Sequence, residues 1–128
     1  MHMSTPISPG EFLDKLTILE IKSERITDPT KLSNVCRERD ALRATWAASS
    51  LAARDVSALV ARLKAINETL WDIEDRIRRH EADQLFDAAF IALARAVYRT
   101  NDDRAAIKRE LNVALGSDLI EEKSYTPY

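Results

Sequence analysis

Cationic side chains crowd one stretch near the C-terminal end of the chain, between residues 95 and 109. Arg104 and Lys108 stand one helical turn apart in it, so both can lie on one face of a helix. Cations paired in this way bind carboxylates and phosphates. Asp102 and Asp103, however, precede them where a helix start would otherwise attract an anion. The stretch therefore indicates either an anion-binding site or a capped turn whose arginines pair with acidic residues elsewhere.

Carboxylates at helical spacing are the second candidate for chemistry. Glu11 and Asp14 are spaced i, i+3, and so are Asp72 and Asp75. Two such pairs on facing helices could hold Mg²⁺, as in all-helical hydrolases of nucleotides. Simpler roles are available, because Glu11 can complete a helix cap and Asp72 can pair with Arg76 one turn on. We favour charged helix faces in contact with solvent, and we predict no metal site and no cofactor.

Few other side chains are suited to catalysis. His80 follows two arginines at the predicted end of a helix, where a protonated imidazole is stabilised. Cys36 falls on the inward face of a predicted helix and, as the single cysteine, cannot form a disulfide within the chain. Trp46 and Trp71 have apolar neighbours at helical spacing, which favours packing in a core or an interface. We therefore predict no catalytic residue and favour a protein that is not an enzyme.

The bulk composition excludes several classes of protein. The 128 residues include only two glycines, and alanine and leucine dominate the chain. A β-sandwich or barrel needs more turn residues, and no glycine-rich nucleotide loop is present. A net charge of −2 argues against a nucleic-acid partner, and no apolar run approaches the about 20 residues of a membrane span. We expect one cytoplasmic domain over residues 1–128, with a partly vector-derived leader (1–7) and a polar C-terminal tail (117–128).

The first two helices have clear start signals. Ser8 and Glu11 form a capping box around Pro9, and two apolar stripes on different sides of the helix follow. A helix that is apolar on two sides is either central in its domain or shared with another subunit. Asp28 caps the second helix ahead of a proline. The second stripe of the first helix is our sequence-based reason to expect a dimer.

Three further helices complete the predicted fold. Asp55 caps the third, whose apolar residues keep a seven-residue rhythm. Its buried seam is expected to consist of Leu63, Ile66, Leu70 and Ile73. Residues 101–103 interrupt the fourth helix and start a short fifth one, which Gly116 ends. The predicted fold is all-α, an antiparallel bundle of three long helices with two shorter C-terminal helices packed across it.

The C-terminal tail carries its own prediction. Glu121 and Glu122 are adjacent acids, which complement the cations of residues 98–109. Gly116 permits the chain to reverse towards them. Charge alone would hold such a tail weakly, so we expect Leu119 and other apolar tail residues to be buried against the domain. A docked tail would form one wall of a polar pocket.

Three motifs together resemble a small bacterial family of unknown function, domain of unknown function 6165. They are SPGEFLDKLTILEIK at residues 8–22, YRTND at 98–102 with KRELN at 108–112, and EEKSY at 121–125. The resemblance spans residues 7–125 and brings no activity with it. It implies that polar residues of the motifs are the first candidates for a shared site. These residues are Lys15, Glu20, Tyr98, Asn101, Asp102, Lys108, Glu122, Lys123 and Tyr125.

The full set of candidate ligand-binding residues adds the arginines of the cationic stretch, Arg99, Arg104 and Arg109. The leading hypothesis is a non-enzymatic interaction or assembly module that forms a homodimer or binds a protein partner. The first alternative is a protein that binds a small anion of the sugar or nucleotide type, using the cationic stretch and the tail. The second is an Mg-dependent helical hydrolase that uses the helix carboxylates.

Overall fold

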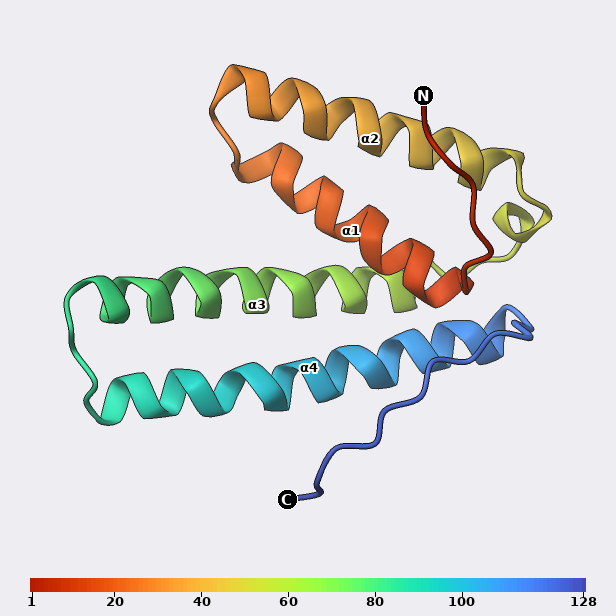
Figure 1. Ribbon diagram of the computed structural model, residues 1–128. Coiled ribbons are helices and arrows are strands. Elements are labelled where there is room, and N and C mark those ends of the chain that lie inside the picture. Colours follow the sequence, from red (N-terminus) through yellow and green to blue (C-terminus); the bar gives the residue numbers. More distant parts are fainter.

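The computed structural model describes all of residues 1–128. Its helices form two antiparallel hairpins, a short one and a long one (Figure 1). The elements are α1 (Pro9–Arg25), α2 (Pro29–Ala48), the 3₁₀ helix η1 (Ser50–Ala53), α3 (Ser57–Ala82) and α4 (Ala88–Ala114). Among the helices, α1 packs against α2, α3 and α4, whereas α2 packs only against α1 and η1. The class is all-α as predicted, but the arrangement is two hairpins and not a three-helix bundle with two helices across it.

The starts of α1 and α2 confirm the sequence signals. Ser8 Oγ accepts a hydrogen bond from the Glu11 N–H over 3.2 Å, and Asp28 accepts one from the Lys31 N–H over 2.9 Å. The start of α3 differs from the prediction, because Val56 is its N-cap and no side chain caps the helix. Asp55 accepts hydrogen bonds from the N–H and the hydroxyl of Ser57 instead.

The predicted break at residues 101–103 is wrong, since α4 runs without interruption from Ala88 to Ala114. Asn and Asp lower helix stability by less than about 1 kcal/mol each, which packing readily outweighs. That packing comes from Leu93, Ile107 and Leu111, which are buried along the same helix. The side chains of Asn101 and Asp102 also contact other side chains and do not cap a helix start.

Two helix ends use a residue with left-handed backbone geometry. Gly116, at φ 65°, ends α4, where the Ser117 N–H donates to the Asn112 carbonyl over 2.9 Å. Gln84 takes the same position after α3 at φ 56°, and the Leu85 N–H donates to the His80 carbonyl. Glycine adopts this geometry without strain, whereas glutamine does not. The glycine cap after α4 was predicted, and the glutamine cap was not.

The apolar core is small and lies where α1 meets the α3–α4 hairpin. It consists of Leu13, Leu16, Leu63, Ile107, Leu111 and Leu115. The expected seam of α3 is only half correct, because Leu63 and Ile73 are buried while Ile66 and Leu70 are partly exposed. The heptad rhythm cannot show that a polar residue, Asn67, turns inward between them. None of the residues of α2 is buried, so this helix mainly covers α1.

The second apolar stripe of α1 is not free for a partner. Ile21 is buried within the chain, and Ile18 is partly buried. The reason is that α1 has neighbours on three sides, namely α2, α3 and α4. Of the two interpretations of this helix, the central position is the correct one. No helix has both the length and the apolar character needed to cross a membrane.

Candidate functional site

A polar network lies at the junction of α1, α3, α4 and the C-terminal tail. It begins at the first turn of α1, where the Gly10 N–H donates to Asn112 Oδ1 over 2.7 Å. This N–H is one of the four at a helix start that have no partner within the helix. A side chain at position 10 would not fit, because a Cβ there would lie 2.5 Å from the Lys108 carbonyl oxygen. Gly10 therefore sets how closely α1 approaches α4.

Asp14 lies at the centre of the network, with 2% of its surface exposed. Its Oδ1 accepts a hydrogen bond from Asn67 Nδ2 over 2.9 Å, and its Oδ2 lies 3.0 Å from the Arg104 guanidinium. The same Asn67 amide donates to Thr17 Oγ1. One carboxylate thus joins α1 to both α3 and α4. A buried charge is stable only when it is paired and hydrogen-bonded, and both conditions are met.

Lys108 is the second buried charge, with 8% of its side chain exposed. Its ammonium lies 2.5 Å from Glu11 Oε2 and 2.8 Å from Glu121 Oε2 of the tail. Burial acts to lower the pKa of Lys108, but the hydrogen bonds to Glu11 and Glu121 and the charge of Asp14 outweigh it, so the pKa is raised. The hydrogen bond from Lys108 conversely lowers the pKa of Glu121. Both groups are therefore charged at neutral pH.

The C-terminal tail lies back along α4 (Figure 1), in the direction predicted from its charges. Arg109 Nη1 lies 3.3 Å from Glu122 Oε2 of the tail. Further along, the Tyr128 ring contacts Tyr98 edge to face, with 5.1 Å between ring centroids, and its hydroxyl donates to Asp102. That hydrogen bond raises the pKa of Tyr128.

The expected apolar anchors of the tail are wrong. Leu119, Ile120 and Tyr125 all remain exposed. The tail is held instead by two ion pairs with α4 and by the Tyr98–Tyr128 contact. The exposed Arg109–Glu122 pair contributes little, so the tail depends mainly on the contact of Glu121 with the buried Lys108.

A match over residues 3–128 connects the chain to the Family of unknown function (DUF6165). The chain belongs to this family. The resemblance inferred from its sequence is thereby confirmed, over nearly the whole chain. Comparison with curated proteins and with solved structures gave no match. Membership of DUF6165 brings no activity with it, so the function must be argued from the geometry of the site.

The structure brings together part of the candidate set, around α4 and the tail. Arg104 and Lys108 share the network with Glu121, and Arg109 pairs with Glu122. The Lys123 ammonium lies 6.0 Å from the centre of the Tyr125 ring. Four further candidates also lie on α4. Tyr98 and Asp102 contact Tyr128, Asn101 accepts a hydrogen bond from Arg104 over 3.4 Å, and Arg99 is exposed.

Two candidates lie elsewhere. The Lys15 ammonium is 3.1 Å from Glu38 of α2. Glu20 faces Arg43 and Lys64 at 3.8 and 4.0 Å. Both residues therefore join α1 to neighbouring helices at a distance from the tail.

Sequence reasoning missed five residues of the site. Asn67 and Asn112 are buried amides on α3 and α4, and Thr17 is a buried hydroxyl on α1. Gly10 and Tyr128 contact α4 from the two ends of the chain. The signal for Asn67 was present, because it lies one turn after Leu63 on a helix whose inward positions are otherwise apolar. An amide in such a register indicates a buried hydrogen-bonding partner.

The helix carboxylates do not converge on a metal-binding point. Glu11 and Asp14 are engaged by Lys108 and Arg104, and Asp72 and Asp75 pair with arginines of α1 and α3, respectively. No group of three or more His, Cys, Asp and Glu side chains could hold a metal ion. The same geometry leaves no buried side-chain nitrogen or oxygen without a hydrogen-bond partner. The network therefore acts chiefly as a polar connection between helices.

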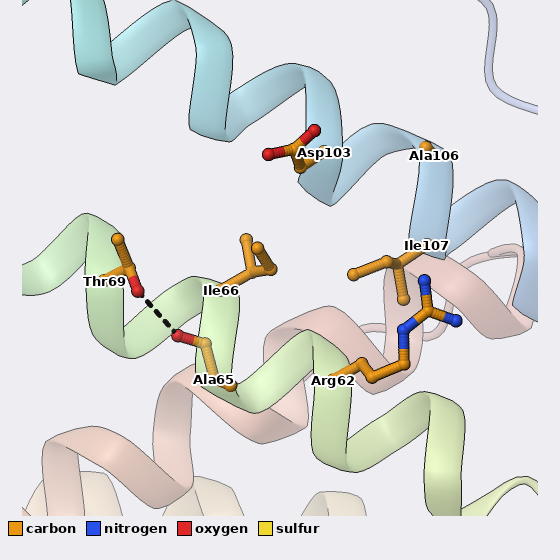
Figure 2. A pocket seen from close by; sticks show the side chains of 7 residues that line it. All are labelled: Arg62, Ala65, Ile66, Thr69, Asp103, Ala106 and Ile107. Carbon is orange, nitrogen blue, oxygen red and sulfur yellow. Dashed lines mark hydrogen bonds between the residues drawn. The ribbon is translucent and has the colours of Figure 1, made fainter.

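A groove of about 420 Å³ lies between α3 and α4. Figure 2 looks into it, with α1 behind the two helices, so the groove opens on the side away from α1. Its lining residues are Arg62, Ala65, Ile66, Thr69, Asp103, Ala106 and Ile107. Small side chains at Ala65 and Ala106 keep the groove open, and apolar side chains from both helices form its floor. Nothing else in the chain covers this face.

The histidine, the cysteine and the two tryptophans considered in the sequence all contribute to helix packing or helix ends. His80 Nδ1 lies 3.0 Å from the Arg76 carbonyl, and Cys36 is partly buried on α2. Trp46 stacks on Phe12 at 6.0 Å, and the Arg25 guanidinium lies 5.7 Å from the centre of the Trp71 ring. Both tryptophans thus pack between helices.

Proposed function

We propose that the chain is a non-enzymatic assembly module that functions as a homodimer. The observation that carries the proposal is the extent of its surface. The accessible area is 8765 Å² for a chain of 14.5 kDa. A compact monomer of this mass exposes about 6,900 Å², so the chain exposes about a quarter more. Only 17 of its 128 residues are buried.

The surplus surface includes apolar side chains on the α3–α4 hairpin. The closed end of this hairpin extends beyond α1 and α2 (Figure 1). Leu85, Phe86 and Ile91 at that end are 51%, 53% and 57% exposed. Scattered exposed apolar residues are ordinary, but neighbouring ones on a projecting element are typical of interaction surfaces. Association would bury these side chains, and each Å² of apolar surface removed from water would stabilise the dimer by about 25 cal/mol.

The pairing of the buried charges supports the non-enzymatic part of the proposal, because it leaves no charged group of the network free to react. Each buried charge in the network has an opposite charge within hydrogen-bond distance. A catalytic group, in contrast, is commonly left poised with a perturbed pKa in a cleft. The network instead fixes α1 on the hairpin and leaves the hairpin's other face free for a partner.

Mass measured by light scattering over a range of protein concentrations tests the proposal. We expect twice 14.5 kDa at micromolar concentration and a fall towards 14.5 kDa on dilution. A mass of one chain at every concentration, up to the highest that can be reached, would overturn it.

A second candidate function is favoured by one contact, that of Glu121 with Lys108 over 2.8 Å. The tail places a carboxylate on a buried ammonium, and a carboxylate-bearing small molecule could take its place. The test is a chain truncated after Ser117, with acetate and inorganic phosphate as probes. Thermal stabilisation of the truncated chain that is lost in Lys108→Met would support anion binding. Equal stabilisation of both proteins would exclude this site.

A further inference from the structure

A small hollow lies between α4 and the C-terminal tail, with a volume of about 20 Å³. Its lining residues are Ala105, Lys108, Arg109, Asn112, Glu121 and Lys123. On the basis of the second candidate function above, we propose that this hollow binds the phosphate group of a small phosphate monoester. The carboxylate of Glu121 competes with that ligand for the Lys108 ammonium.

Asn112 supplies an unused hydrogen-bond donor to the hollow. Only 2% of Asn112 is exposed, and its Oδ1 accepts the hydrogen bond from the Gly10 N–H. Its Nδ2 donates no hydrogen bond within the chain, although every fully buried side-chain nitrogen and oxygen has a partner. The Nδ2 atom is therefore the part of Asn112 that reaches the hollow. A nearly buried amide nitrogen with two N–H donors favours an acceptor that comes from outside the chain.

The contacts of the tail show what kind of group the cations accept. Lys108 and Arg109 are adjacent on α4, and each is paired with one of two adjacent tail acids, at 2.8 and 3.3 Å. The hydrogen bond from Lys108 and the charge of Lys123 both lower the pKa of Glu121. The cations around the hollow thus stabilise an anion at this position. Ammonium and guanidinium groups bind phosphate oxygens by the same charge-assisted hydrogen bonds.

The balance of charge favours a ligand with two negative charges. Four cations and four carboxylates meet at this junction. They are Arg104, Lys108, Arg109 and Lys123, and Glu11, Asp14, Glu121 and Glu122. When the two tail carboxylates move away, two positive charges lose their counterions. A phosphate monoester carries about two negative charges at neutral pH, whereas a simple carboxylate carries one.

The size of the hollow makes the tail a competitor of the ligand. With the tail in place, the space holds about one water molecule. A phosphate group can therefore enter only after the Glu121 carboxylate has left the Lys108 ammonium. The apparent affinity for phosphate is reduced by the fraction of time that Glu121 occupies this position.

A second hollow accounts for the organic part of the ligand. It has a volume of about 350 Å³ and adjoins the first at Lys123, which lines both. Its other lining residues are Asp102, Tyr125, Thr126, Pro127 and Tyr128. Tyr128 keeps its contacts with Tyr98 and Asp102 when Glu121 moves, so this part of the tail stays in place. A carboxylate and two tyrosine rings suit a small organic group that carries hydroxyls.

Calorimetric titration of the full chain tests the ligand class. Glycerol 3-phosphate is the ester probe, and inorganic phosphate and acetate are compared with it at equal ionic strength. We expect the ester to bind most tightly and acetate to bind at least about tenfold more weakly than the ester. Glu121→Gln removes the competing carboxylate and should tighten the binding of the ester about threefold or more.

Two variants test the site itself, each with a matched control on exposed α2. Asn112→Asp keeps an oxygen for the Gly10 N–H but replaces the Nδ2 donor with a carboxylate oxygen, so it should weaken ester binding about tenfold or more. Asn34→Asp should leave the binding unchanged. Arg109→Gln changes an exposed side chain, so it tests the site even if Asn112→Asp does not fold. It should weaken binding about threefold or more, and Arg37→Gln should not. Circular dichroism checks that every variant keeps its helices.

The outcomes separate this site from the function on which it rests. Acetate binding as tight as that of both phosphates would overturn the phosphate site but leave anion binding standing. Equal affinities for glycerol 3-phosphate and inorganic phosphate would overturn the monoester as ligand. Ester binding that neither Asn112→Asp nor Arg109→Gln changes would overturn the hollow as its location. A chain that binds none of the three anions, with or without Glu121→Gln, would overturn both the site and the second candidate function.

Discussion

Gly10 and Asn112 lie 102 positions apart in the chain, yet the Gly10 N–H donates to Asn112 Oδ1 over 2.7 Å. This contact joins the first turn of α1 to the last turns of α4, beside the Lys108 carbonyl. The closeness of the two helices at this point depends on the missing side chain of Gly10. The two ends of the domain are thereby connected directly.

Gly10→Ala is expected to destabilise the protein by about 1–3 kcal/mol, the usual cost of overpacking a close contact. The added Cβ would meet a backbone carbonyl at 2.5 Å, and a backbone atom cannot rotate away as a side chain can. Urea unfolding followed by circular dichroism measures the change. Ser33→Ala on exposed α2 is the control and should stay within about 0.5 kcal/mol. Equal stability of the two variants would contradict the close approach.

Gln84→Gly is expected to stabilise the protein by about 0.5–1 kcal/mol, because glycine adopts φ 56° without the strain of a Cβ. Gly116→Gln is the mirror change at φ 65°, and it should destabilise by a similar amount. No atom lies within 4 Å of a Cβ built at Gly116, so only backbone strain acts there. Thermal unfolding of both variants compares the two helix ends. Changes of the same sign would show that strain is not the cause.

Asp14→Ala is expected to cost about 3–5 kcal/mol, because it removes the carboxylate that faces the Arg104 guanidinium in the buried network. Asp72→Ala breaks the pair with Arg25 on the surface and should cost less than about 1 kcal/mol. Urea unfolding of the two variants separates buried from exposed ion pairs. A loss below 1 kcal/mol in Asp14→Ala would mean that solvent reaches the network.

Acidification is expected to release the tail. Because the pKa of Glu121 is lowered in the folded chain, its contact with Lys108 contributes stability above the ordinary value of 4.5 and loses it as the pH falls through the lowered pKa. At the alkaline end, the pKa of Lys108 is raised in the folded chain. The contact therefore keeps its full stability up to the ordinary lysine pKa of 10.5 and loses it only as the pH rises further, through the raised pKa.

The mobility of the backbone of residues 119–128, measured by NMR relaxation, reports this release. The tail should become more mobile below pH 4.5, while α4 stays rigid. Glu121→Gln should remove the acid step and leave the tail mobile at neutral pH. A tail that is equally mobile in both proteins at neutral pH would show that the Lys108 contact does not hold it.

Local chemistry determined much of this protein from sequence alone. The caps at Ser8 and Asp28 and the glycine end at Gly116 act within one helical turn, so they could be predicted without knowledge of the fold. Helical class followed from composition in the same way. The charges of Glu121 and Glu122 also predicted the direction of the tail, since the cations of α4 are concentrated nearby in the chain.

Tertiary structure alone decided where the polar residues lie. Asn101–Asp103 continue α4, because burial of Leu93 and Ile107 on one face outweighs the weak local preference for a break. Asp14 and Asn67 meet only because α1 crosses the α3–α4 hairpin, and the two residues are 53 positions apart. Side-chain charge and polarity can be read from a sequence, but desolvation depends on which helices pack together, and that packing sums contacts along the entire chain.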